Sequence, residues 1–303
     1  MRCYFLASGS SGNCTALVND NDEILLIDCG IAISDIKNKL EQVGLSIENV
    51  KKILITHMHV DHVKSIRAFE SKDLYLNVLT EMNECNLFDY YEELEVLGFK
   101  IYTLPASHDS PGTTGFLIEY NNEKMAYITD TGYIHENIQR IINNCDIYCI
   151  ESNHDPRLLM LTKRPMFLKN RILSSSGHLS NQDCSYVLGN VIGPKTKQII
   201  FLHRSQEANS EDMVNQTFIS TMNKMGVNVS NIDTKIARAN EVVVLENIKT
   251  LEIREVNISL LPSSICEGSI LSLENDCYVL DNNEELRRRQ LIEERFKRLV
   301  NKD

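Results

Sequence analysis

The heptapeptide Thr56-His57-Met58-His59-Val60-Asp61-His62 places three imidazoles and a carboxylate at the end of the predicted strand Lys52–Thr56. Side chains at positions i and i+2 of an extended backbone point the same way, so His57 and His59 can bind one metal ion. The next turn offers Asp61 and His62 to a second ion. Neutral imidazole and carboxylate are ligands of zinc and manganese sites, and with eight histidines in 303 residues such a cluster is not expected by chance.

Further polar residues follow other predicted strands. His108 follows KIYTLPAS, His203 follows QIIFL, and Asp130 lies between the run MAYIT and a glycine turn. His154 comes shortly after DIYCI. Polar side chains at the C-terminal ends of strands are where α/β folds place their sites. Two neighbouring ions need a bridging ligand, and Asp130, His108 and His203 complete the inventory of candidate ligands.

Strand-like and helix-like patterns alternate over residues 1–236. The predicted strands are Glu23–Ile27, Lys52–Thr56, Leu74–Val78, Lys100–Leu104, Gly115–Glu119, Lys124–Thr129, Asp146–Ile150 and Gln198–Leu202. The pair on either side of Asn121-Asn122 predicts a hairpin. The predicted helices are 34–43 with Ser34 as its cap, His62–Glu70, Ile134–Ile142, Asn181–Val191 and Ser210–Met225.

The pattern changes after about residue 236, which predicts two domains, 1–236 and 237–303. Short strands are expected at Glu241–Leu245, Thr250–Val256, Ser269–Leu273 and Cys277–Leu280, followed by a charged helix over Glu284–Val300. The basic residues of that helix fit either a clamp on nucleic acid or a solvated face with i,i+4 ion pairs. We favour the solvated face, because glutamates are interspersed among the arginines.

The composition is that of a soluble globular protein rather than a disordered or collagen-like chain. Lys and Arg total 31 against 42 Asp and Glu, a formal charge of −11, which argues against a wholly basic surface but leaves room for a local basic groove. No apolar run approaches a membrane span, and the N-terminus lacks the apolar core of a signal peptide. Nine scattered cysteines without a CxxC pair agree with a cytoplasmic location and no membrane association.

The HxHxDH stretch with a later His, Asp and His resembles the metallo-β-lactamase fold superfamily over residues 1–236. Three stretches, Ser8–Asn13 (SGSSGN), Glu151–Asp155 (ESNHD) and Gly177–Asn181 (GHLSN), are similar to the YycJ/WalJ-type branch of exonuclease-like hydrolases. Residues 164–172 also resemble the segment before GHLSN in that branch. The residues from 237 resemble a small uncharacterised β domain fused to other bacterial hydrolases.

This resemblance implies an αββα sandwich, an α/β (α+β) fold, that holds two divalent metal ions, Zn, Mn or Fe, at its loop end. Carried over residue by residue, the first ion would be held by His57, His59 and His108, the second by Asp61, His62 and His203, and Asp130 would bridge them. Asp28 matches the buried aspartate that supports the HxHxDH loop. The chain departs from the branch at Arg204 and Ala208, where a leucine and an asparagine are usual.

The candidate catalytic residues are Asp61, His178 and His154. In the similar tRNase Z group, a histidine at the place of His178 donates a proton to the leaving oxygen, and an ordinary imidazole pKa of about 6.5 suits that role. His178 could instead cap a helix or bind a phosphate. His154 contacts a substrate phosphate or braces the site. The Ser8–Asn13 loop either presents N–H groups to a phosphate or forms a tight turn beside the metals.

The leading hypothesis is a metal-dependent phosphodiesterase with a nucleic acid substrate, DNA in preference to RNA, that degrades DNA from a 5′ end. A local basic set supports it: Arg157, Lys163, Arg164, Lys169, Arg171 and Arg204. The alternatives are a hydrolase of a small thioester or cyclic phosphodiester, an RNA-processing nuclease, a di-iron redox protein, and a non-catalytic binding protein. No pattern in the sequence indicates an oligomeric state.

Overall fold

The computed structural model describes residues 1–79, 84–237, 242–246, 253–257, 270–274 and 277–281, with 284 and 287. The chain divides into two compact units, Met1–Ala239 and Asn240–Asp303. The domain boundary after residue 236 stays a prediction. Glu284 and Arg287 are helical and form an i,i+3 ion pair, and the rest of the predicted helix Glu284–Val300 lies outside the described residues.

The first unit contains two mixed sheets. The six-stranded sheet has the order β1 (Arg2–Ala7), β2 (Cys14–Val18), β3 (Ile24–Ile27), β4 (Val50–Leu54), β5 (Leu74–Asn77) and β6 (Asn86–Phe88). Its first three strands are antiparallel, and β3 to β6 are parallel.

The second sheet has seven strands. Their order is β13 (Asp233–Ile236), β12 (Gln198–Leu202), β11 (Ile147–Glu151), β10 (Glu123–Ile128), β9 (Thr114–Tyr120), β8 (Phe99–Pro105) and β7 (Glu93–Val96). Strands β7 to β10 are antiparallel and β10 to β13 are parallel. The predicted β9–β10 hairpin is confirmed, and both turn residues, Asn121 and Asn122, have the positive φ of a tight hairpin turn.

Alternating apolar side chains give the first sheet two buried faces. In β3, Leu25 and Ile27 point into the core between the sheets, whereas Leu26 points to the outer core beneath helix α1 (Ile33–Gln42). Ile36 and Leu40 of α1 are fully buried there. A strand that is buried on both faces is expected where helices cover the sheet.

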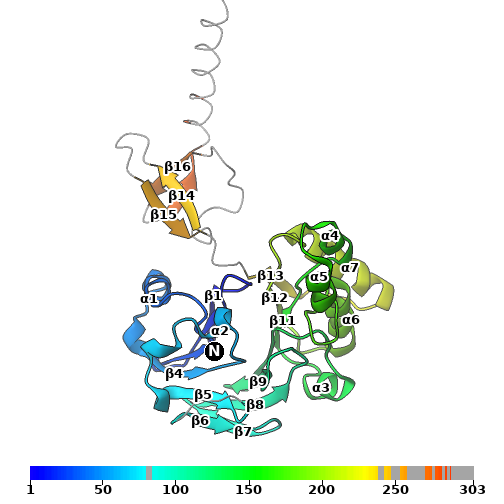
Figure 1. The fold of residues 1–303 in the computed structure, drawn as a ribbon, viewed down its shortest axis with the longest axis horizontal. Helices are drawn as coiled ribbons and strands as arrows, with labels where there is room; N and C mark the ends of the chain where they lie inside the picture. Colours follow the sequence, from blue (N-terminus) through cyan, green and yellow to red (C-terminus); the bar gives the residue numbers. More distant parts are fainter. Residues whose placement is uncertain are drawn as a thin grey trace, which may run out of the picture. The chain divides into compact units, whose positions relative to one another are not determined.

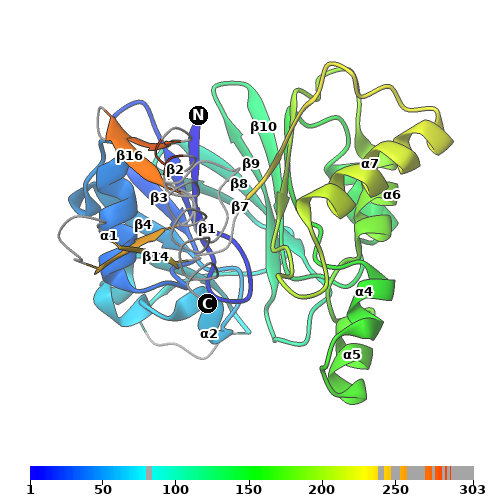
Figure 2. The same ribbon diagram turned by 90° about the horizontal axis from the view of Figure 1, so that it is seen from above.

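The second sheet repeats this arrangement. Ile200 and Leu202 of β12 face the core between the sheets, and Phe201 faces outward onto Phe218 of α7 (Glu211–Met225). Helices α3 (Glu136–Ile141) and α6 (Asn181–Val191) pack against the same outer core. The layers are therefore helix, sheet, sheet, helix, visible in Figures 1 and 2, and the predicted αββα sandwich is confirmed.

Most predicted elements are present, and helix α6 has the predicted bounds because Ser180 caps it by accepting from the N–H of Asp183. Two predictions are wrong in detail. Helix α1 begins after Ala32, and Ser34 lies inside its first turn. The predicted helix His62–Glu70 is replaced by α2 (Val60–Val63) and short 3-10 turns, because the backbone groups of His62 and Ser65 bond Cys29 instead.

Several elements of the first unit correspond to no predicted one: β1, β2, β6, β7, β13, α4 (Pro156–Leu161) and α5 (Met166–Ile172). The remaining 3-10 turns span Ile47–Asn49, Ile66–Ala68 and Ser71–Asp73. The second unit contains the antiparallel pairs β14 (Val242–Glu246) with β15 (Ile253–Asn257) and β16 (Leu271–Glu274) with β17 (Cys277–Leu280), close to the predicted strands.

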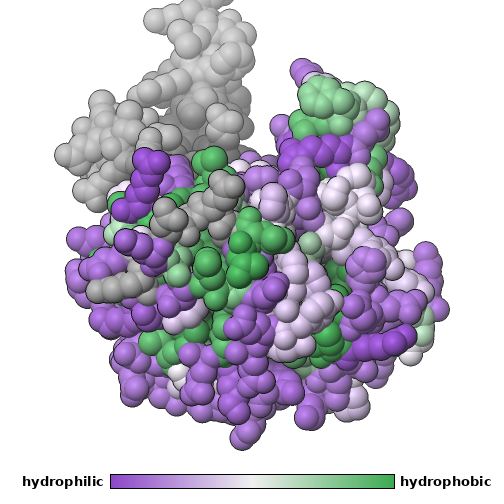
Figure 3. Space-filling model, turned by 60° about the horizontal axis from the view of Figure 1, so that its bottom comes forward, coloured by the Kyte–Doolittle hydropathy of each residue, from purple (hydrophilic) through white to green (hydrophobic). Residues whose placement is uncertain are grey.

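Hydrophilic residues cover most of the face of the molecule that Figure 3 draws in colour, with apolar patches between them. This agrees with the predominance of charged side chains over aromatic ones in the composition. Among the helices of the described residues, none is both long enough and apolar enough to cross a membrane.

Candidate metal centre

Three residues of the centre sit where a strand ends and adopt a left-handed backbone. Asp28 follows β3, Asp130 follows β10 and His203 follows β12, with φ of 61°, 52° and 52°. A side chain in this conformation costs on the order of 1 kcal/mol or more, and such strain is concentrated at functional sites. The turn at each strand end directs these polar groups to the same edge of the two sheets.

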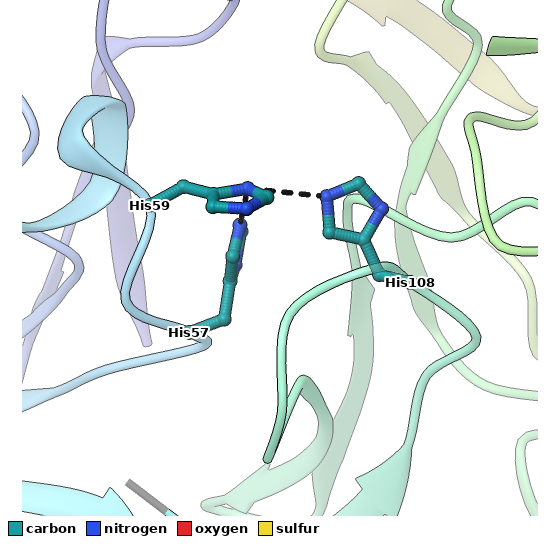
Figure 4. Close-up of side chains that lie close together, drawn as sticks. All are labelled: His57, His59 and His108. Carbon is teal, nitrogen blue, oxygen red and sulfur yellow. Dashed lines mark hydrogen bonds between the residues drawn. The ribbon is translucent and has the colours of Figure 1, made fainter. Parts of the chain in front are cut away.

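The first ligand group consists of three histidines whose rings converge (Figure 4). Nδ1 of His59 lies 3.1 Å from Nε2 of His57 and 3.3 Å from Nε2 of His108. One ring nitrogen carries at most one proton, so Nδ1 of His59 cannot donate to both neighbours. Two imidazole nitrogens on a tetrahedral zinc ion lie about 3.3 Å apart, which matches these spacings.

The second ligand group joins Asp61, His62 and His203. Oδ2 of Asp61 is 3.8 Å from Nε2 of His62 and 4.0 Å from Nε2 of His203. Oδ2 of Asp130 lies 3.2 Å from Nε2 of His62, and Asp130 also groups with His57, a member of the first set. Asp130 therefore lies between the two groups, as expected of a bridging carboxylate.

Two buried polar atoms at this point fit a cation. Nε2 of His203 has no hydrogen-bond partner among the described residues, and Oδ2 of Asp130 has no neighbour there at such a distance other than Nε2 of His62 at 3.2 Å. Buried polar atoms are normally bonded, so a pair facing the same ligand group calls for an additional partner. A divalent cation satisfies both atoms, and the residues present fit a metal.

Most of the histidines are oriented through the ring nitrogen that faces away from the centre. Nδ1 of His57 lies 3.1 Å from Oγ1 of Thr56, and Nδ1 of His108 lies 3.0 Å from the carbonyl oxygen of Gly177. Nδ1 of His203 lies 2.8 Å from Oε1 of Glu151. Such partners fix the tautomer and direct the other nitrogen toward the ligand groups.

Asp28 orients His62 and the loop that carries it. Its Oδ2 lies 2.7 Å from Nδ1 of His62, and its Oδ1 accepts from the N–H of Thr56 at 2.8 Å. The side chain is fully buried. These contacts agree with the supporting role that the resemblance implies for Asp28.

Glu151 is a candidate functional residue that the sequence analysis quoted within a motif but assigned no role. It is the last residue of β11 and is fully buried. One oxygen, Oε1, contacts both Nδ1 of His178 at 2.7 Å and Nδ1 of His203 at 2.8 Å. Burial raises the pKa of this carboxyl, but the two imidazoles outweigh that effect and bring the pKa to about 2. The sequence does contain an indication of this role, because Glu151 is an acidic residue at the end of an apolar strand, like the candidate ligands that follow other strands.

His178 lies beside the ligand groups with its Nδ1 held by Glu151 and 3.6 Å from Oδ1 of Asp130. Its side chain retains 18% of its exposure, so Nε2 is the nitrogen left for a substrate. Burial by itself lowers the pKa of His178, but the Glu151 carboxylate outweighs that effect and raises the pKa to about 9. The expectation of an ordinary pKa is wrong, because it did not include this ion pair between residues 27 positions apart.

His154 is not brought into any of the ligand groups found among the described residues. It is 1% exposed, and burial lowers its pKa to about 4. Its backbone bridges to Ser180, and its carbonyl accepts from the N–H of Asn181, next to the His178 loop. This placement favours the bracing interpretation over contact with a phosphate.

The Ser8–Asn13 loop also contacts the centre. Oγ of Ser8 accepts from the N–H of His203 at 2.8 Å, and the Asn13 amide lies 3.0 Å from Nε2 of His62. Ser10 and Ser11 are exposed at its tip. The loop thus contacts two candidate ligands, His203 through its backbone and His62 at the ring nitrogen that faces the second ligand group.

Two facing sheets with a histidine and aspartate set at one edge define a metal-dependent hydrolase of the metallo-β-lactamase fold. The beta-lactamase superfamily domain matches residues 24–203. The fold is similar to the metallo-beta-lactamase fold protein YhfI from Bacillus subtilis, with a TM-score of 0.56 and 14% identity over 84% of this chain and 98% of that one.

Curated relatives narrow the family. The chain is 30% identical over 247 residues to exodeoxyribonuclease WalJ of Streptococcus pneumoniae, covering 76% of this chain and 91% of the relative. It is 29% identical over 238 residues to exodeoxyribonuclease YycJ of Bacillus anthracis, covering 74% and 90%. The chain therefore belongs to the YycJ/WalJ family within the β-lactamase superfamily.

Proposed function

We propose that the chain is a dinuclear phosphodiesterase that removes nucleotides from the 5′ end of DNA. The observation that carries this proposal is the pair of ligand groups that meet at Asp130, with His178 held beside them by Glu151. The YycJ and WalJ relatives, both named exodeoxyribonucleases, support DNA as the substrate.

The proposed ligands are His57, His59 and His108 for one ion, Asp61, His62 and His203 for the other, and Asp130 between them. When bound there, two divalent ions, Zn, Mn or Fe, would supply Lewis acidity that favours deprotonation of water and offsets negative charge on a phosphodiester. The donor set of imidazoles and carboxylates suits all three metals.

The chain's own residues move the protons. Asp61 is partly exposed, and its Oδ2 faces the same space as His62 and His203, where it can accept a proton from the attacking water. Attack forms a new P–O bond as the bond to the leaving oxygen breaks. Nε2–H of His178, protonated at neutral pH, donates to that oxygen. We propose that His154 braces the His178 loop.

The proposal also includes a cytoplasmic location for the enzyme. The described cysteines are free thiols, and Cys14, Cys29, Cys145, Cys149 and Cys184 are buried. Free thiols fit a reducing compartment, which supports a cytoplasmic location.

The test is hydrolysis of double-stranded DNA labelled at either end, beside RNA and bis-p-nitrophenyl phosphate, with Mn²⁺ or Zn²⁺. Stepwise loss of 5′ nucleotides is expected for the native chain and is abolished in His59→Ala. His135→Ala is the matched control, since His135 is exposed and belongs to no ligand group of the described residues. Loss from the 3′ end would refute the polarity, and cleavage of RNA alone or of the small ester alone would refute the DNA substrate.

A further inference from the structure

Helices α4 and α5 form an arm that leads directly into the catalytic loop. The carbonyl of Ile172 at the end of α5 accepts from the N–H of His178. A Cβ on Gly177 would lie 2.2 Å from the carbonyl oxygen of Arg171, so the helix end and the loop are in direct contact. Arg171 also pairs with Asp109, whose Oδ1 is 3.3 Å from Nε2 of His108. The base of the arm is thus attached to both sides of the metal centre.

The arm is held together from within. Nζ of the buried Lys169 donates to the carbonyl oxygens of Met160 at 2.7 Å and Thr162 at 2.8 Å, tying α5 to the end of α4. Leu159 and Ile172 form a small core with Ala208, one of the two departures from the family pattern. These contacts use only the inner face of each helix.

Several large apolar side chains of the arm are unusually exposed. Phe167 is 74% exposed, Leu161 is 80% exposed and Met166 is 55% exposed. Met160 and Leu173 are exposed in the same segment. Figure 2 shows α4 and α5 at the end of the helical layer, beyond α6 and α7. Large apolar side chains gathered on a surface mark a binding site rather than a fold requirement.

The exposed cations of the arm favour a ligand with negative charge. Residues 156–182 contain five Lys and Arg and no Asp or Glu. Arg157, Arg164 and Arg171 pair with Asp155, Glu207 and Asp109, and Lys169 is buried, whereas Lys163 forms no ion pair among the described residues. Arg157 and Lys163 are exposed in the same segment of the chain as the apolar side chains. An exposed aromatic ring among cations is the arrangement that binds single-stranded nucleic acid, with bases stacked on the ring and phosphates near the cations.

We propose that the α4–α5 arm binds unpaired nucleotides of the substrate, with Phe167 as the stacking platform, next to the scissile end at His178. This rests on the proposed nuclease function and adds a specificity-determining element to it. Stacking on an aromatic side chain changes affinity by about tenfold or more per base, so Phe167→Ala should weaken binding of a single strand by about that factor. Phe167→Leu, which keeps apolar area without a ring, should weaken it similarly.

Phe167→Trp gives a direct reading, because the sequence contains no tryptophan. In the full-length protein, a phosphorothioate-linked oligodeoxythymidine should quench the fluorescence of F167W by stacking. Tyr186→Trp on α6, 59% exposed at the native tyrosine, is the control that should not be quenched. Equal quenching of both variants, or of neither, overturns the proposal. A fluorescence shift with phosphatidylglycerol vesicles but not with the oligonucleotide would also overturn it, in favour of a membrane surface.

The proposed contact between Lys163 and a phosphate is tested separately, through the salt dependence of binding. Lys163→Gln should lower the dependence of log affinity on log salt by about 0.7, the value for one phosphate contact of a single strand. Lys37→Gln, an exposed lysine on α1, should leave it unchanged. Hydrolysis of bis-p-nitrophenyl phosphate by the native chain and F167A is measured alongside. If neither protein hydrolyses this ester, the proposed function is refuted. If F167A keeps both the native rate of hydrolysis and the native affinity for the oligonucleotide, only the role of the arm is refuted.

Discussion

A single carboxylate oxygen, Oε1 of Glu151, connects the candidate proton donor His178 with the candidate ligand His203. The two imidazoles are therefore not independent, since the group that keeps His178 protonated also orients His203. Residue-scale experiments have to separate proton donation from metal binding.

His178→Ala separates the two through the choice of leaving group. Hydrolysis of DNA should slow by about 10²–10⁴, because an alkoxide needs a proton as it departs. Hydrolysis of bis-p-nitrophenyl phosphate should stay within several-fold of the native rate, since p-nitrophenolate leaves unprotonated. The two rates are measured on metal-loaded protein, and equal losses on both substrates would contradict the acid role.

Glu151→Gln should change the pH dependence of DNA hydrolysis. The carboxylate raises the pKa of His178 to about 9, so the donor is protonated below that pH and the rate falls as pH rises through it. Without the negative charge, the alkaline limb should move toward the ordinary histidine pKa of about 6.5. Glu136→Gln, on the exposed start of α3, is the control. If the fall in rate at high pH occurs at the same pH in Glu151→Gln, that fall is due to a group other than His178.

At the scale of the elements, the loop after β3 supports the loop after β4 by direct backbone contact. A Cβ on Gly30 would lie 1.7 Å from the carbonyl oxygen of Asp61, and the N–H of Asn13 bonds that same oxygen. The position of Asp61 therefore depends on a glycine in a different loop.

Gly30→Ala should push this loop out of place and reduce metal content and hydrolysis by at least tenfold, in addition to an overpacking cost of about 1–3 kcal/mol. Gly44→Ala is the matched control: Gly44 ends α1 with φ of 75° and has open space around it, so it should lose stability without losing metal. Metal content by mass spectrometry and thermal unfolding are compared, and full metal occupancy in G30A would disprove the dependence.

The elements also show how far the sequence could predict the structure. Buried strands such as Gln198–Leu202 were predicted with correct bounds, because an uninterrupted apolar run has few other conformations. The candidate ligands could be found because they follow such runs. The arm was missed, since α4 and α5 are short and their apolar side chains are largely exposed. The helix after His62 was overpredicted, because bonds to Cys29 compete with helical ones.

At the scale of the whole molecule, the candidate ligands come from both sheets, so a bound metal would connect them. A ligand that binds only the folded state at a thousand times its Kd adds about 4 kcal/mol of stability. Metal removal by a chelator should therefore lower the melting temperature of the native chain by about ten degrees.

Asp130→Ala should lose both metal retention and hydrolysis, and its melting temperature should no longer respond to the chelator. Asp212→Ala, an exposed residue in the first turn of α7, should behave like the native chain. The comparison uses calorimetry with and without chelator. A chelator response that persists in D130A would remove Asp130 from the proposed bridging position.

The spread of the ligands along the chain has a consequence for biosynthesis. His57, His59 and His108 all lie within the first 108 of the 303 residues, whereas His203 is synthesised much later. On the proposed ligand set, the second ion cannot be bound until β12 has joined the sheet and turned His203 toward Asp61. On that proposal, a nascent chain that lacks His203 cannot complete the second ligand group, and hydrolysis has to wait until that residue has been added.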